Sequence, residues 1–114
     1  MDITVDKDYI DVDDALKRIG GNMGLFKKLL GRFVDGNHLE ALESAVRGGN
    51  TEEIAHLAHT VKGVSSNLSL VKITAASTEL EQLVKNGQDP AACIESLKQA
   101  FEVTNGIIAE IVSS

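Results

Sequence analysis

Residues 58–70 read AHTVKGVSSNLSL and lie near the middle of a chain of 114 residues. If residues 51–68 form one α-helix, which turns about 100° per residue, the apolar and small side chains share one stripe. The members of that stripe are Ile54, Leu57, Ala58, Val61, Ser65 and Leu68. Their i, i+3, i+4, i+7 spacing is typical of a helix side that faces a protein core. The sequence therefore predicts an amphipathic helix over this range.

His59 lies on the other side of the predicted helix, roughly 160° from the centre of the apolar stripe. Lys62 follows one turn later on the same flank, and the other close neighbours of His59 are small, namely Ala55, Gly63 and Ser66. Gly in a helix interior is about 1 kcal/mol less favourable than Ala, so Gly63 indicates that a large partner needs room beside the imidazole. A solvated helix face with an incidental His is the alternative that the helical wheel leaves open.

Five further segments carry apolar residues at helical spacing, with Gly, Asn or Pro at the breaks between them. The expected helices cover about 11–19, 22–34, 39–46, 70–86 and 90–111. Asn22 and Asn50 stand where N-caps are expected. Asn105-Gly106 would ordinarily mark a turn, but the apolar spacing continues in phase across it, which favours one continuous or bent helix.

Amphipathic helices with short connections bury their apolar stripes by packing together. We therefore expect an all-α fold, an antiparallel four-helix bundle with additional short N-terminal helices. The expected organisation is an extended acidic lead-in over residues 1–10 and a single helical domain over residues 11–114. Leu57, Val61, Leu80 and Phe101 are predicted to be buried, and His59 and Lys62 to be exposed.

Composition excludes several classes of function. A net charge of −6 disfavours nucleic acid, which selects for basic surfaces. No apolar run approaches the roughly 18 residues of a membrane span, and the first residues lack the pattern of a signal peptide. Cys93 is the single cysteine, so no internal disulfide can form. These features predict a cytoplasmic protein that binds neither nucleic acid nor membrane. We also expect a monomer.

The segment His59-Thr-Val-Lys62-Gly63 resembles the His-x-x-Lys-Gly signature of histidine-containing phosphotransfer (HPt) domains. The similarity extends over nearly the whole chain. It includes Gly20-Gly21-Asn22 and Gly48-Gly49-Asn50 upstream and the pair Leu80-Glu81 downstream. Ser69 departs from the pattern, because the family usually has Gly ten residues after the His. Either a turn there uses a non-Gly backbone or the helix runs on.

The resemblance implies a four-helix bundle that carries phosphoryl groups in two-component phosphorelays. His59 would accept a phosphoryl group from the aspartyl phosphate of a receiver domain and pass it to a response regulator. A histidine kinase, including a hybrid kinase, is the other possible donor. Lys62 would neutralise phosphoryl charge, and the partner would dock over Ala55, Gly63 and Ser66. No ATP-binding signature is present, so an autonomous enzyme is not expected. No cofactor is expected either, because Mg²⁺ would be bound by the partner receiver.

Glu81 lies 22 residues after His59, at about the same distance from a turn near residues 69–70. In HPt domains a Glu or Gln on this helix often hydrogen-bonds the imidazole and fixes its tautomer. The resemblance therefore implies an orienting role for Glu81. The alternative is an ordinary surface residue.

Two other interpretations carry less weight. His56-x-x-His59 with Glu52 or Glu53 has the spacing of a helical metal site, but no Cys ligand is near, and we predict no metal site. His38 and His56 are predicted to be surface residues.

The first alternative function is a helical-bundle interaction module that is not phosphorylated. The second, a histidine-kinase dimerisation domain, is disfavoured because Thr60 and Val64 stand where such domains have an acidic residue and a Pro.

Overall fold

The computed structural model describes residues 5–114, and all regular structure within that range is helical. The elements are α1 (Val12–Arg18), α2 (Met23–Asp35), α3 (His38–Gly48), α4 (Thr51–Asn67), α5 (Val71–Lys85), the 3₁₀ helix η1 (Pro90–Cys93) and α6 (Ile94–Ser113). The sequence predicted each of these helices to within a few residues at each end. The difference is at the start of the last helix, where Pro90–Cys93 forms a 3₁₀ turn rather than the first turn of an α-helix. Such turns are common at helix N-termini.

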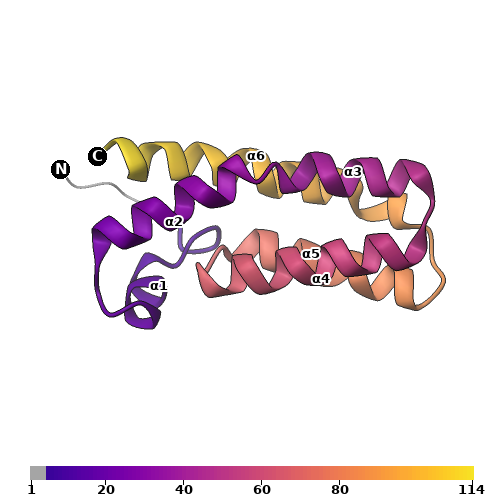
Figure 1. Cartoon of the computed structure of the whole chain (residues 1–114), viewed down its shortest axis with the longest axis horizontal. Helices are drawn as coiled ribbons and strands as arrows, with labels where there is room; N and C mark the ends of the chain where they lie inside the picture. Colours follow the sequence, from indigo (N-terminus) through magenta and orange to yellow (C-terminus); the bar gives the residue numbers. More distant parts are fainter. Residues whose placement is uncertain (1–4) are drawn as a thin grey trace.

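The helices pack into an elongated bundle with extents of 45 × 22 × 22 Å (Figure 1). The two helices α4 and α5 form an antiparallel hairpin, and α6 returns along α5. Helices α2 and α3 follow one another along α6, and α3 also packs against α4. The four bundle helices are thus α3 to α6, with α2 extending one of them and α1 at one end. The predicted all-α antiparallel four-helix bundle is confirmed.

Side-chain caps and local turns define where the helices begin. The side chain of Asn22 accepts a hydrogen bond from the N–H of Leu25 at 3.0 Å, and that of Asn50 accepts from the N–H of Glu53 at 3.1 Å. Both caps satisfy backbone donors that a helix cannot satisfy internally, as predicted. Helix α6 runs through Asn105 without a break, which confirms the continuous helix that the apolar phase favoured.

The predicted apolar stripe of α4 faces the core with one exception. Five of its six members are buried, and they are Ile54, Ala58, Val61, Ser65 and Leu68. Leu57 is only half-buried, so its predicted burial is wrong. It lies at the edge of the stripe, where one flank of the side chain meets solvent. Leu80 and Phe101 are buried as predicted.

The turn between α4 and α5 places these two helices side by side. Ser69 adopts a left-handed backbone with φ of 54°, a conformation that favours glycine. Of the two alternatives, the chain therefore turns here with a non-glycine residue, and α4 does not continue through Ser69. The Ser69 hydroxyl donates to Oδ2 of Asp14 at 2.6 Å, and the Ser69 carbonyl accepts from the N–H of Asp11 at 3.0 Å. The hydroxyl contact connects the turn to α1 and could not be made by glycine, whereas the carbonyl contact is a backbone contact that any residue could make.

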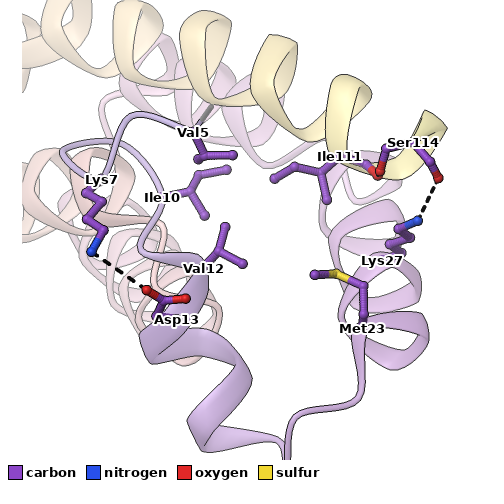
Figure 2. A pocket seen from close by; sticks show the side chains of 9 residues that line it. All are labelled: Val5, Lys7, Ile10, Val12, Asp13, Met23, Lys27, Ile111 and Ser114. Atoms are coloured by element: carbon purple, nitrogen blue, oxygen red, sulfur yellow. Dashed lines mark hydrogen bonds and ion pairs between the residues drawn. The ribbon is translucent and has the colours of Figure 1, made fainter. Parts of the chain in front are cut away.

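Residues 1–4 of the predicted lead-in lie outside the described residues, and the proposed division at residue 11 stays a prediction. Within the described part, the N–H groups of Tyr9 and Ile10 both donate to the Asp6 carbonyl at 3.0 Å, so a turn precedes α1. Ile10 is fully buried. Beside it lies a groove of about 530 Å³ between this segment, α2 and the end of α6 (Figure 2). In the described range, no helix is both long and apolar enough to cross a membrane.

Candidate functional site

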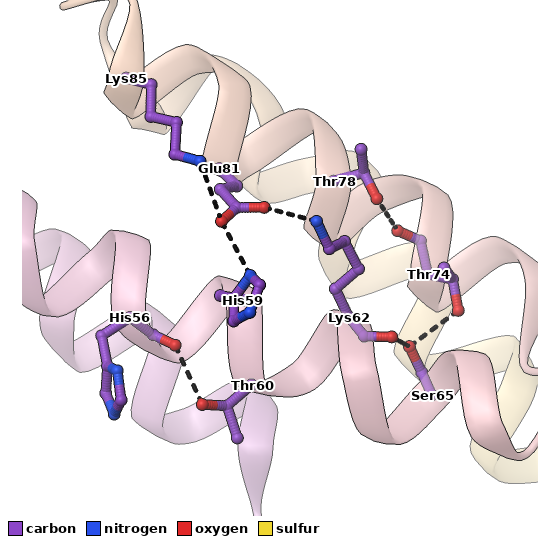
Figure 3. Close-up of polar contacts among 9 residues, drawn as sticks. All are labelled: His56, His59, Thr60, Lys62, Ser65, Thr74, Thr78, Glu81 and Lys85. Carbon is purple, nitrogen blue, oxygen red and sulfur yellow. Dashed lines mark hydrogen bonds and ion pairs between the residues drawn. The ribbon is translucent and has the colours of Figure 1, made fainter.

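The side chain of His59 projects from the middle of α4 with 67% of its surface exposed. The ring lies beside the neighbouring helix α5 with its Nδ1 directed at that helix (Figure 3). The opposite ring nitrogen, Nε2, makes no hydrogen bond to any residue of the described part of the chain. The exposure of His59 is as predicted, and it leaves one nitrogen accessible from solution.

Glu81 lies on α5 and is buried, with only 5% of its side chain exposed. Its Oε2 is 3.1 Å from Nδ1 of His59. The interpretation of Glu81 as an ordinary surface residue is therefore wrong. The antiparallel hairpin brings the two residues together because each lies at a similar distance from the Ser69 turn. The structure places a carboxylate where it can orient the imidazole.

Two lysines complete the cluster around this carboxylate. Lys62 donates to Oε1 of Glu81 at 2.9 Å, and the ammonium of Lys85 lies 3.4 Å from Oε2 (Figure 3). Lys62 was predicted to be exposed, but its side chain is only 34% exposed, because its stem lies along the helix interface to reach Glu81. Sequence reasoning missed Lys85. The signal was its i, i+4 spacing from Glu81 on one helix, a spacing that favours ion pairs.

The lysines keep Glu81 ionised at neutral pH. The hydrogen bond from Lys62, supported by Lys85, lowers the pKa of Glu81 to about 2, against the opposing effect of burial. A permanently ionised carboxylate can only accept hydrogen bonds, so it favours the imidazole tautomer with the proton on Nδ1. In that tautomer the lone pair resides on Nε2, the nitrogen that faces solution. The ring is thus arranged as a nucleophile.

The small residues predicted to line a docking surface surround the ring unevenly. Gly63 and Ser66 are exposed, and Ala55 is half-buried. A Cβ added at Gly63 would meet no atom within 4 Å, so the glycine is not required by packing inside this chain. The surface next to His59 is therefore open to a large partner.

The other two histidines differ from this arrangement. His56 is exposed, as predicted. His38 is half-buried with its ring centroid 4.9 Å from that of Phe33, so its predicted surface position is wrong. Phe33, the apolar residue that it contacts, lies five residues earlier across the α2–α3 junction, and the two rings are tilted by 35°. Burial lowers the pKa of His38. Among residues 5–114, no three or more His, Cys, Asp or Glu side chains are grouped to hold a metal ion.

None of the residues that line the groove shown in Figure 2 belongs to the His59 cluster. The cluster itself lies at the surface where α4 meets α5, with the side chain of His59 67% exposed (Figure 3).

Known proteins resemble this chain in sequence and in fold. A family model described as Hpt domain matches residues 32–107, more than half of the chain. The crystal structure of histidine-containing phosphotransfer protein B (HptB) from Pseudomonas aeruginosa is similar, with a TM-score of 0.82 and 25% identity over 92% of this chain and 95% of that chain. The HPT domain of an Hpt sensor hybrid histidine kinase from Shewanella shares the fold, with a TM-score of 0.81 and 15% identity over 95% of this chain and 97% of that chain. No curated protein matches this chain.

Proposed function

We propose, from the premise that this chain belongs to the Hpt domain family, that His59 is the residue on which it carries the phosphoryl group. Hpt domains are phosphotransfer domains of two-component phosphorelays, and they are phosphocarriers rather than autonomous enzymes. They interact with receiver domains and histidine kinases. The finer assignment made here concerns the acceptor atom, the residues that assist it and the direction of transfer.

One observation carries the proposal. The imidazole of His59 is two-thirds exposed while its Nδ1 lies 3.1 Å from a buried carboxylate. Neither a packed core histidine nor a free surface histidine has both properties. The combination fixes one nitrogen and leaves the other open to a partner.

The chemical step is an in-line displacement at phosphorus. The lone pair on Nε2 of His59 attacks the phosphorus of a receiver aspartyl phosphate, an N–P bond forms, and the P–O bond to the aspartyl carboxylate breaks. The partner recovers its carboxylate. The proton on Nδ1 stays in place, so the ring gains positive charge, which the carboxylate of Glu81 stabilises. The reverse displacement then passes the group to the aspartate of a response regulator.

The neighbouring residues have separate roles. Lys62 neutralises charge on the phosphoryl group, and Glu81 orients the imidazole. Gly63, Ser66 and Ala55 provide the surface over which the receiver settles. Mg²⁺ would be supplied by the receiver, and this chain needs no cofactor of its own. A histidine kinase, including a hybrid kinase, is the alternative donor, and a cytoplasmic monomer is the expected state.

The test is phosphoryl transfer from a panel of purified receiver domains phosphorylated on aspartate. We expect acid-labile label on the wild-type chain and none on the His59→Gln variant. Label that persists in this variant would move the acceptor to His56 or His38. A chain that binds receivers but takes label from none of them, nor from histidine kinases, would instead be a helical-bundle interaction module that is not phosphorylated.

A further inference from the structure

The cluster around Glu81 contains a conflict between two roles of Lys62. The proposed function requires its ammonium to neutralise a phosphoryl group on His59, yet that ammonium already donates to Oε1 of Glu81 at 2.9 Å. An ammonium has three N–H donors and can reach both groups, but its single positive charge is then shared between two anions, which weakens its attraction to the carboxylate.

Weakening the contact between Lys62 and Glu81 is unfavourable in free energy, because Glu81 is buried. A charge with 5% of its side chain exposed has little water to replace a lost partner. Removing one partner of a buried ion pair is strongly destabilising, since it leaves an uncompensated charge. With Lys62 as the only counter-ion, Glu81 would hold the ammonium back from the phosphoryl group.

Lys85 resolves the conflict by its position. Its ammonium lies 3.4 Å from Oε2 of Glu81, the oxygen that Lys62 does not use. It belongs to the same helix as Glu81, one turn later, so it can stay with the carboxylate whatever happens on α4. Its side chain is 61% exposed and therefore free to shorten the contact.

We propose that Lys85 is the reserve counter-ion of Glu81, the cation that keeps the buried carboxylate paired while Lys62 turns to the phosphoryl group on His59. The inference rests on the proposed function of His59. Lys85 is a positioning residue, because it acts through Glu81 and Lys62 and does not touch the phosphoryl group.

The charges of the cluster agree with this role. Two ammonium groups and one carboxylate leave a single net positive charge beside His59, which attracts an anionic phosphoryl group. Without Lys85 the remaining pair is neutral, and an incoming phosphoryl group competes with Glu81 for one lysine. The structure thus provides a cation for each of the two anions present after transfer.

The experiment uses potassium phosphoramidate, a small phosphoryl donor that needs no docking surface. The rate of His59 phosphorylation is measured for the wild type, Lys85→Met, Lys85→Arg and, as a matched control that removes one exposed lysine elsewhere, Lys28→Met. We expect Lys85→Met to be about two- to fivefold slower, the range of an exposed ion pair. Lys85→Arg and Lys28→Met should retain the wild-type rate. A Lys85→Met rate equal to wild type would overturn the proposal.

A double-mutant cycle with Glu81→Gln separates this mechanism from a direct effect of charge. Neutral Gln needs no counter-ion, so Lys62 is free without Lys85. The effect of Lys85→Met should therefore vanish in the Glu81→Gln background. The same fold-change in both backgrounds would show that Lys85 acts directly on the phosphoryl group, and the reserve role would be rejected.

The two proposals can fail independently. If receivers phosphorylate His59 but the cycle is additive, only the role of Lys85 fails. If no receiver or kinase phosphorylates His59, the proposed function fails, while the phosphoramidate rates still report on Lys85. Thermal melting of Lys85→Met shows whether the fold is retained, and where it is not, Lys85→Gln takes its place in the cycle.

Discussion

The face of α4 and α5 around His59 and the junction of α2 and α3 around His38 each hold a histidine, but the two regions treat the imidazole in opposite ways. The ring of His59 is exposed and its Nδ1 meets a carboxylate at 3.1 Å. The ring of His38 is half-buried against Phe33, and in the described structure no carboxylate lies within ion-pairing distance. The first environment orients an exposed ring, whereas the second packs the ring against another side chain.

The glycines near the two rings differ in the same sense. A Cβ at Gly63 would enter open space, whereas a Cβ at Gly36 would lie 2.8 Å from Nε2 of His38. Gly63 therefore leaves room for something outside the chain, and Gly36 leaves room for a ring within it. The comparison teaches that the same residue types acquire function from what surrounds them.

The largest expected effect separates the two histidines directly. His59→Gln should abolish phosphoryl acceptance and change the unfolding free energy by no more than about 0.5 kcal/mol, because exposed substitutions have small effects. His38→Gln should retain acceptance and lower the unfolding free energy, because it removes packing against Phe33. Radiolabel transfer and urea unfolding on both variants check this. If the His38 variant is fully folded but accepts no phosphoryl group, the distinction between the two histidines is wrong.

The next effect concerns the glycines. Gly63→Gln should slow transfer from a phosphorylated receiver at least tenfold by blocking close approach, while the helix gains up to about 1 kcal/mol in stability. Gly36→Ala should lower the melting temperature, because the added methyl group displaces the His38 ring. Melting curves and transfer rates measured on each variant test both statements. A Gly63 variant that melts lower but transfers normally per folded molecule would remove the docking role.

A smaller effect is expected at the lysine beside the imidazole. Lys62→Ala should slow transfer by about tenfold or less without abolishing it, since the Mg²⁺ of the partner receiver neutralises much of the same charge. Single-turnover rates from a phosphorylated receiver measure the change. An unchanged rate would reduce Lys62 to a structural partner of Glu81.

The smallest expected effects are two changes of folding stability with pH, one from each region. The pKa of Glu81 in the folded chain is about 2, below its ordinary 4.5, so its stabilising contribution is present above about pH 4.5 and lost as the pH falls toward 2. The pKa of His38 is lowered from 6.5, so protonation favours the unfolded chain and stability declines as the pH falls below about 6.5. Urea unfolding across this range should show both steps.

Matched variants assign the steps to their residues. Glu81→Gln should reduce the lower step, to which Asp14 also contributes because the hydrogen bond from Ser69 lowers the pKa of its carboxyl, and His38→Gln should remove the upper one. If both steps survive in both variants, the pH dependence belongs to other groups.

Much of this molecule could be predicted from the sequence because local physics determines it. Apolar spacing, the caps at Asn22 and Asn50, and the breaks at Gly pairs all act within a few residues of one another. They were sufficient to predict six helices, the bundle, the exposed side of α4 and the position of His59 on that side. The resemblance of the His59–Gly63 segment then indicated the chemistry.

What only the tertiary structure determined depends on residues far apart in the chain. The burial of Glu81 and the partial burial of Lys62 arise because the Ser69 turn folds α5 back against α4. The contact between the rings of His38 and Phe33 spans the α2–α3 junction, for whose geometry helical periodicity carries no information. Hydrophobic pattern specifies which side of a helix is inside. The charge and orientation of a functional group are set by its neighbours across the interface, where burial strengthens each electrostatic contact.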